Sequence, residues 1–148
     1  MIKKEYEDLL YVEGNGEHRS HIQHEAMEQE ALFSWAEHMQ YSIPDLALLY
    51  HIPNGGKRNR AEAARLKRQG VKAGVPDIHL PVARGGYHGL YIELKANEKN
   101  KPTEKQSGWI RELREQGYAA EVCVGWDAAR DLILKYVKMR RTQCHDAR

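Results

Sequence analysis

Two short apolar segments joined by a glycine-containing turn restrict the possible folds of this chain more than any other feature. Residues 77–82 (DIHLPV) and 89–95 (GLYIELK) have the length and composition of strands. Between them lies the sequence ARGG at 83–86, a composition expected of a hairpin turn. The sequence therefore predicts an antiparallel hairpin near the middle of the chain.

Helical patterns precede and follow this hairpin. Over 24–40 the apolar residues recur at steps of three and four, which is typical of a helix with one buried face. The segment 59–70 begins with a capping residue, is rich in basic helix formers and ends at a glycine, so a second helix is expected there. Thr103 and Gln106 form a capping box that opens a third helix, which is expected to end at Gly117.

The remaining segments complete a mixed pattern of helices and strands. Residues 119–125 (AAEVCVG) form a third apolar segment, short enough to be a strand inside a sheet, and Asp127 is expected to cap a last helix. Residues 46–52 fit either a strand or a helix end, because periodicity does not separate the two in so short a run. The order of elements predicts an α/β fold in which a mixed central sheet is flanked by helices.

Length and composition indicate one compact domain. The chain has 148 residues, of which 41% are hydrophobic, and this is enough for a single core. We expect a polar lead-in over 1–23, the packed domain over 24–138 and a basic tail over 139–148. No apolar run approaches the roughly 20 residues of a membrane-spanning helix. Because two cysteines cannot form a disulfide framework, the expected location is the reducing cytoplasm, away from membranes.

Positive charge is concentrated in one part of the sequence. Between residues 57 and 72 there are seven basic side chains and one acidic side chain, Glu62, although the whole chain has a net charge of only +2. Such a cluster fits either a surface that follows nucleic-acid phosphates or a helix face that is simply solvated. The tail from residue 135 onwards adds a second basic cluster.

Three charged residues of the hairpin are expected to meet. Side chains alternate along a strand, so Glu93 and Lys95 face one side of the sheet while Leu94 faces the other. Asp77 lies sixteen residues before Glu93, a separation that suits two strands and a turn, and pairing then brings the two carboxylates side by side. Two carboxylates and one ammonium group therefore converge.

This arrangement suits metal-assisted hydrolysis of phosphodiesters. Two carboxylates a few ångströms apart repel each other unless a cation lies between them, and Mg²⁺ takes oxygen ligands together with water and phosphate. A bound divalent ion can lower the pKa of water, and Lys95 can position that water or stabilise developing charge. The alternative is an exposed ion pair between Glu93 and Lys95, worth about 0.2–1 kcal/mol, with Asp77 merely starting a turn.

Longer strings around these residues resemble those of a known family. They are IPNGG at 52–56, GVKAGVPD at 70–77, PVARGGYHG at 81–89, IELK at 92–95, Gln106, and REQGY at 114–118. Together they resemble the VRR-NUC nucleases, a branch of the PD-(D/E)xK superfamily found in phages, bacteria and eukaryotic DNA repair. The chain is most similar to the small standalone members of that branch from phages and bacteria.

The resemblance implies a restriction-endonuclease-like PD-(D/E)xK core and assigns roles to residues of this chain. Asp77 and Glu93 are expected to hold Mg²⁺ or Mn²⁺, and Lys95 is expected to be the catalytic lysine. The resemblance also implies a further metal-binding glutamate from the first helix, and Glu25 and Glu28 both qualify by position. The alternative for each of these two is a solvated glutamate at the start of a helix.

Two further polar residues have both a structural and a functional interpretation. Gln106 corresponds to a glutamine that family members carry near the active site, yet its side chain also fits the capping box with Thr103. Asn54 lies in an Asn-Gly turn signal and is also expected to contact the site or the DNA backbone. The residues expected to bind DNA are Asn54, Lys57, Arg58, Arg60, Lys67, Arg68 and Lys72.

These inferences predict a metal-dependent DNA endonuclease. Its preferred substrate is expected to be branched DNA, on which it would act as a homodimer, like the junction resolvases. The alternatives are a flap-processing, end-processing or restriction-like nuclease, and a DNA-binding protein of a replication or repair assembly that does not cleave. The glycine pairs lack the spacing of a P-loop or a dinucleotide fingerprint, so no nucleotide cofactor is expected.

Overall fold

A computed structural model of the chain describes residues 20–54 and 59–143. Its elements are helix α2 (Ser20–Met39), 3₁₀ helix η1 (Pro44–Leu48), strand β1 (Tyr50–His51), helix α3 (Arg60–Arg68), strands β2 (Ile78–Leu80) and β3 (Leu90–Lys95), helix α4 (Glu104–Glu115), strand β4 (Ala119–Val124) and helix α5 (Trp126–Val137). In these two stretches no helix has the length and apolarity that crossing a membrane requires. The expectations for Lys57 and Arg58, for residues 1–19 of the lead-in and for residues 144–148 of the basic tail lie outside the described residues.

The predicted hairpin is present and forms the centre of a four-stranded sheet with the order β1-β2-β3-β4. Ile78 pairs with Ile92 and Leu80 with Leu90 in antiparallel register. Strand β1 adds to β2 in the antiparallel direction, whereas β4 runs parallel to β3. A parallel neighbour requires a crossover, and α4 provides it. The prediction of an α/β fold with a mixed sheet flanked by helices is therefore confirmed.

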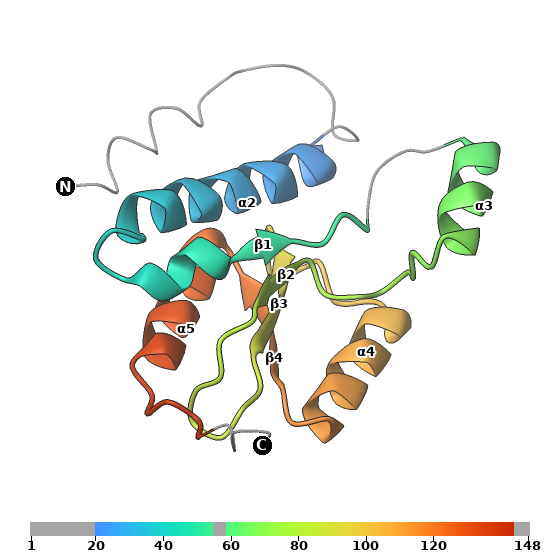
Figure 1. The fold of residues 1–148 in the computed structure, drawn as a ribbon. Coiled ribbons are helices and arrows are strands. Elements are labelled where there is room, and N and C mark those ends of the chain that lie inside the picture. Colours follow the sequence, from blue (N-terminus) through green and yellow to red (C-terminus); the bar gives the residue numbers. More distant parts are fainter. Residues whose placement is uncertain (1–19, 55–58, 144–148) are drawn as a thin grey trace.

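Helices cover both faces of this sheet (Figure 1). Helices α2 and α5 pack against one face and against each other, and α4 packs against the opposite face. The main core lies on the α2 side and includes the fully buried Leu32 and the almost fully buried Ile92. Burial of each such side chain contributes roughly 1.5–3 kcal/mol. A smaller apolar cluster, with Ile110 of α4 and Ala120 of β4, lies on the other face.

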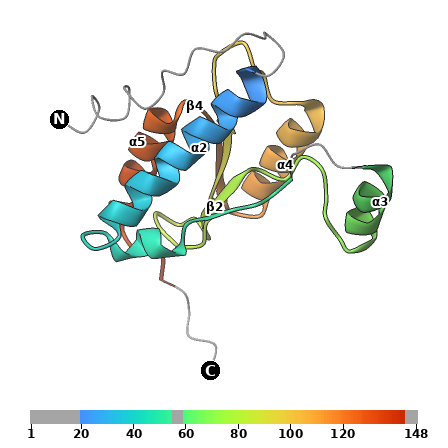
Figure 2. The same ribbon diagram turned by 90° about the horizontal axis from the view of Figure 1, so that it is seen from above.

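The basic helix α3 lies apart from these layers (Figures 1 and 2). None of its residues is buried, because its sequence offers Leu66 as the one large apolar side chain. Its predicted cap is present, since the side chain of Asn59 accepts a hydrogen bond of 2.8 Å from the backbone N–H of Glu62. Helix α3 is thus well formed locally but contributes nothing to either core.

The start of α5 differs from the sequence-based expectation. Gly125, with φ of 82°, is the N-cap residue, and Asp127 lies inside the first turn instead of capping it. The backbone N–H of Trp126 donates a hydrogen bond of 2.6 Å to Oε2 of Glu28, which is 98 residues away in the sequence. The expectation for Asp127 was wrong because a remote carboxylate, rather than a local one, satisfies this helix terminus.

The first helix and the segment that follows it also differ in detail from the sequence pattern. Helix α2 begins at Ser20 rather than at His24. The segment 46–52 contains both of the structures left open for it, since η1 ends at Leu48 and β1 begins at Tyr50. The short run therefore changes conformation in the middle, which periodicity does not reveal.

Candidate active site

Strand alternation places Glu93 and Lys95 beside each other. Ile92 and Leu94 of β3 are buried in the main core, so Glu93 and Lys95 face the opposite side of the sheet, where α4 lies. Lys95 Nζ is 2.9 Å from Glu93 Oε1. Glu93 is 1% exposed and Lys95 is 7% exposed. The two residues thus form a buried ion pair, not the exposed pair that the sequence left as an alternative.

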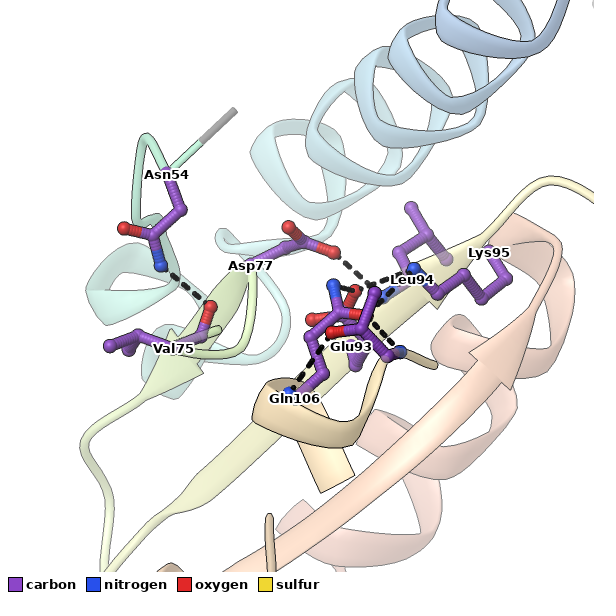
Figure 3. A network of polar contacts seen from close by, with 8 residues as sticks. Asn54, Val75, Asp77, Glu93, Leu94, Lys95 and Gln106 are labelled. Atoms are coloured by element: carbon purple, nitrogen blue, oxygen red, sulfur yellow. Dashed lines mark hydrogen bonds and ion pairs between the residues drawn. The ribbon is translucent and has the colours of Figure 1, made fainter. Parts of the chain in front are cut away.

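Asp77 joins this pair from the residue before β2. Because Ile78 pairs with Ile92, one further step of the same register places Asp77 opposite Glu93. Oδ2 of Asp77 accepts a hydrogen bond of 2.9 Å from the backbone N–H of Leu94, which holds the carboxylate over β3 (Figure 3). The structure therefore brings Asp77, Glu93 and Lys95 together at one end of the hairpin.

Gln106 of α4 completes this cluster (Figure 3). Its Nε2 donates a hydrogen bond to Glu93 Oε1, and its Oε1 lies 3.3 Å from Lys95 Nζ. The same Oε1 accepts a hydrogen bond of 2.8 Å from the backbone N–H of Thr103, which completes the capping box of α4. Gln106 therefore has both of the roles considered from the sequence: it caps α4 and it contacts the buried ion pair, because the start of α4 lies next to that pair.

Burial raises the pKa of both carboxyl groups, and the charge of Asp77 adds to the increase at Glu93. Burial first, and then the nearby Asp77, raise the pKa of Glu93 to about 7, against the opposing effect of Lys95. Burial also raises the pKa of Asp77, although the Leu94 N–H and the charge of Lys95 act in the other direction. The site therefore holds two acidic groups whose charges are not balanced by Lys95 alone.

These shifts and one unpaired atom fit a site for a divalent cation. Glu93 Oε2 is buried and has no hydrogen-bond partner among the described residues. A cation next to Glu93 and Asp77 would pair this oxygen and relieve the repulsion, and two carboxylates with water and phosphate suit a hard ion such as Mg²⁺. Within residues 20–54 and 59–143 no three acidic, histidine or cysteine side chains converge on one point. The donors present therefore fit an ion that keeps several water or substrate ligands.

The two glutamates of α2 have different surroundings. Glu28 is bound to the backbone N–H of Trp126, as described above, and so caps α5. Glu25 is partly buried and lies near enough to Glu93 for its charge to add to the increase in the pKa of that residue. Of the two, Glu25 is therefore the one whose charge acts on Glu93, whereas Glu28 is engaged with the start of α5.

The loop before Asp77 is held on two sides. Nδ2 of Asn54 donates a hydrogen bond of 2.7 Å to the carbonyl oxygen of Val75 (Figure 3), so this side chain braces the loop, and DNA binding by Asn54 stays a prediction. Gly74 has φ of 90°, and a Cβ at this position would lie 2.9 Å from the backbone of Lys105. Only glycine fits this conformation and this approach to α4. Both contacts determine where Asp77 enters the sheet.

The basic residues expected to bind DNA lie on α3 and directly after it. Arg60, Lys67 and Arg68 are exposed on α3, and Lys72 is exposed on the following loop. Lys67 and Lys72 line a groove of about 660 Å³ together with Lys105 of α4. Sequence reasoning missed Lys105, because nothing local to α4 indicates that α3 lies opposite it.

His51 is a second neighbour that sequence reasoning missed. Its Nδ1–H donates a hydrogen bond of 2.8 Å to the carbonyl oxygen of Asp77. Its charge is also among the effects that oppose the burial-driven increase in the pKa of Asp77. The sequence shows His51 only as the end of a short apolar run, since the pairing of β1 with β2 is not encoded locally.

Comparison with known proteins agrees with this geometry. A family model described as the VRR-NUC domain matches residues 19–127, a range that includes all the residues of the cluster. A solved structure named "VRR_NUC domain protein" is 33% identical in sequence and superimposes with a TM-score of 0.70. That match covers 80% of this chain and 92% of the other. No curated protein gives a significant match.

Proposed function

We infer the function from one premise: the chain belongs to the VRR-NUC domain family, whose domain is a nuclease domain of the restriction-endonuclease-like type. We propose that it hydrolyses phosphodiester bonds in DNA and that a divalent ion, Mg²⁺ or Mn²⁺, is required. Asp77 and Glu93 are the proposed ligands of this ion, and Lys95 is the proposed catalytic lysine.

One observation carries this proposal. Glu93 is almost fully buried, its Oε1 is occupied by Lys95 and Gln106, and its Oε2 has no partner among the described residues. Asp77 lies opposite with its own acidity shifted by burial. A carboxylate pair of this kind destabilises a fold unless it is protonated or binds a cation. A metal-binding role explains why the chain keeps it there.

The residues of the site divide the chemistry between them. Asp77 and Glu93 would hold the divalent ion, which when bound would lower the pKa of a water ligand and offset negative charge on the phosphate. The ammonium group of Lys95, held by Glu93 and Gln106, donates hydrogen bonds to the attacking water or to the phosphate oxygen on which charge develops. Gln106 positions both partners from the start of α4.

A third carboxylate from α2 is the next part of the proposal. Glu25 is the better candidate, because its charge acts on Glu93 while Glu28 is engaged with the N–H of Trp126. From its partly buried position Glu25 would act on the ion directly or through a water molecule.

Backbone phosphates are the proposed contact for α3 and its neighbourhood. Arg60, Lys67, Arg68 and Lys72 are exposed there, and exposed basic side chains bind phosphates without reading the base sequence. The domain offers little room for a separate sequence-reading module, so recognition of DNA shape is more consistent with its size than base readout.

Branched DNA is the proposed substrate, cut by a homodimer. Two symmetric active sites would match the two symmetric strands of a four-way junction. The second candidate is a processing nuclease that acts on flaps or ends as a monomer, and the groove beside Lys67, Lys72 and Lys105 favours it because such a groove suits a single strand.

A cleavage panel tests these proposals. Labelled four-way-junction, 5′-flap, single-stranded and linear duplex DNA are incubated with the protein in Mg²⁺, in Mn²⁺ and in EDTA. The wild type is compared with Asp77→Ala, Glu93→Ala and, as a matched control, Glu115→Ala, an exposed glutamate at the far end of α4.

Each outcome has a definite meaning. Symmetric, metal-dependent junction cuts that disappear in Asp77→Ala and Glu93→Ala but persist in Glu115→Ala support the dimeric resolvase. A preference for flaps or ends supports the processing nuclease at the same site. If the wild type binds these DNAs but cuts none of them, the catalytic proposal fails.

A further inference from the structure

The face of the sheet that carries Glu93 continues into a row of aromatic rings. Tyr50 pairs with His79, and His79 pairs with Tyr91, across β1, β2 and β3. Paired residues share a face, so these three side chains lie on the same side of the sheet as Asp77 and Glu93. The rings of His79 and Tyr91 are stacked, with centroids 4.0 Å apart and 6° between their planes.

His79 is an unexpected member of this row. It is 8% exposed, and its Nε2 is buried without a hydrogen-bond partner among the described residues. This nitrogen faces Gly89, where a Cβ would lie 3.1 Å from it. An unpaired buried nitrogen destabilises a fold, so an apolar ring would suit this place better if packing were the only role of His79.

The other ring nitrogen of His79 holds Tyr50. Nδ1 of His79 and Oη of Tyr50 are 2.8 Å apart. A neutral imidazole carries one proton, and we assign it to Nδ1, because Tyr50 Oη can accept it whereas no described group accepts a proton from Nε2. In this tautomer His79 donates and Tyr50 accepts. The phenol proton of Tyr50 is then directed away from His79, and Tyr50 is 46% exposed.

Strand geometry sets the distance between Tyr50 and the proposed metal ligands. The backbone N–H of Ile52 donates to the carbonyl oxygen of Asp77, so Ile52 lies beside Asp77 as Tyr50 lies beside His79. Two residues along a strand span about 6.7 Å and adjacent strands lie about 4.8 Å apart, so the backbone of Tyr50 lies roughly 8 Å from that of Asp77, close to the spacing of neighbouring phosphates on one DNA strand. A strand whose scissile phosphate lies at Asp77 and Glu93 therefore brings an adjacent phosphate within reach of Tyr50.

We propose that Tyr50 binds the phosphodiester next to the scissile one, its phenol donating a hydrogen bond to a phosphate oxygen, and that His79 positions the phenol for this contact. The inference rests on the proposed nuclease function, because it takes the scissile phosphate to lie at Asp77 and Glu93. Tyr50 is then a substrate-binding residue and His79 is a positioning residue. The contact reads the DNA backbone, not the bases.

Two conservative variants separate this role from a structural one. Tyr50→Phe and His79→Phe each keep an aromatic ring and remove one end of the hydrogen bond. Because one hydrogen bond to a charged group is lost, KM should rise about tenfold in both, while kcat stays within about twofold of the wild type. Tyr41→Phe, at a tyrosine that is 88% exposed, is the control. If the hydrogen bond only braced the edge of the sheet, its loss in the two variants would lower the free energy of unfolding and leave KM unchanged.

Methylphosphonate DNA locates the contact. The best substrate of the cleavage panel is synthesised with a single methylphosphonate, which removes one phosphate charge, stepped along the cut strand on both sides of the mapped cut. One position adjacent to the cut should weaken binding by the wild type about tenfold and weaken binding by Tyr50→Phe no further.

The two proposals fail in different ways. If every methylphosphonate position affects the wild type and Tyr50→Phe equally while the wild type still cuts unmodified DNA, this inference is overturned and the nuclease function stands. If the wild type cuts no DNA of the panel, the nuclease function is overturned and the inference falls with it.

Discussion

The two functional regions proposed for this chain are built in opposite ways. Asp77, Glu93 and Lys95 lie at the end of the central hairpin, where Glu93 is almost fully buried and bound by Lys95 and Gln106. The basic helix α3 has no buried residue and stands away from the sheet (Figure 2). The side chains proposed to catalyse the reaction are therefore held in place by burial and hydrogen bonds. The basic side chains proposed to bind DNA are exposed on a helix that packs in neither core.

This contrast has consequences for any substitution. A change at the hairpin should alter the rate at saturating DNA, because it disturbs groups that touch the reacting atoms. A change on α3 should alter affinity and its salt dependence, because exposed charges act through the phosphates. Buried charge also carries a cost in stability that exposed charge does not.

The largest effect is expected at Lys95. In Lys95→Met the ammonium group next to the reacting phosphate is lost while the aliphatic part of the side chain is kept. The rate at saturating DNA should fall about 10²–10³-fold, as for removal of one donor to developing charge. Single-turnover cleavage measures this, and Lys138→Met, at an exposed lysine after α5, should keep the wild-type rate. Equal rates in Lys95→Met and the wild type would remove Lys95 from the chemistry.

The second prediction concerns the stability of the metal-free protein. The pKa of Glu93 is about 7 in the folded chain and near 4.5 when the side chain is free of its surroundings. As pH rises, the Glu93 carboxyl therefore loses its proton at a lower pH in the unfolded chain than in the folded chain. The contribution of Glu93 to the free energy of unfolding falls between about pH 4.5 and about pH 7 and is level above that.

Glu93→Gln removes this titration and should stabilise the metal-free protein. The advantage over the wild type should grow across that pH window to roughly 3 kcal/mol, since each pKa unit corresponds to about 1.4 kcal/mol. Urea denaturation at several pH values measures it, and Glu115→Gln is the exposed control. A difference that is constant from pH 5 to pH 8 would contradict the burial cost assigned to Glu93.

A third prediction separates the two glutamates of α2. Glu25→Ala should slow cleavage about 10- to 100-fold, as for loss of a group that supports a metal site, with little change in the free energy of unfolding. Glu28→Ala should do the reverse, because it removes the cap on Trp126 and costs about 1 kcal/mol of stability. Paired kinetic and denaturation measurements decide this, and loss of activity confined to Glu28→Ala would reverse the assignment.

The smallest effect is expected on α3. Lys67→Ala combined with Arg68→Ala should weaken DNA binding severalfold and reduce the slope of log K against log salt by about 0.9 for each phosphate that the variant no longer binds. The free energy of unfolding should change by less than about 0.5 kcal/mol, since neither side chain packs in a core. Fluorescence anisotropy across a salt series tests this, with Arg111→Ala on the exposed side of α4 as the control.

The hairpin and its charged residues were predictable because they follow local rules. The alternation along 89–95 predicted which side chains share a face of the sheet. The turn composition at 83–86 predicted the antiparallel pairing that places Asp77 opposite Glu93. The capping signal at Thr103 located the start of α4, whereas the place of Gln106 near the site was implied by the family resemblance.

Contacts between distant segments were not predictable in the same way. Glu28 caps a helix 98 residues away, so local pattern assigned that cap to Asp127. Lys105 faces the groove beside α3, and His51 binds the Asp77 carbonyl, only because of the tertiary arrangement. Such residues leave no periodic or motif signal, since their partners come from other elements.

Anomalous diffraction from crystals of the protein soaked in Mn²⁺ tests the central claim most directly. The account predicts one strong manganese peak between the carboxylates of Asp77 and Glu93, at about 2.1 Å from the nearest oxygens as for a hard divalent ion, and no such peak in Glu93→Gln. Manganese bound only elsewhere, with cleavage intact in Glu93→Gln, would contradict it.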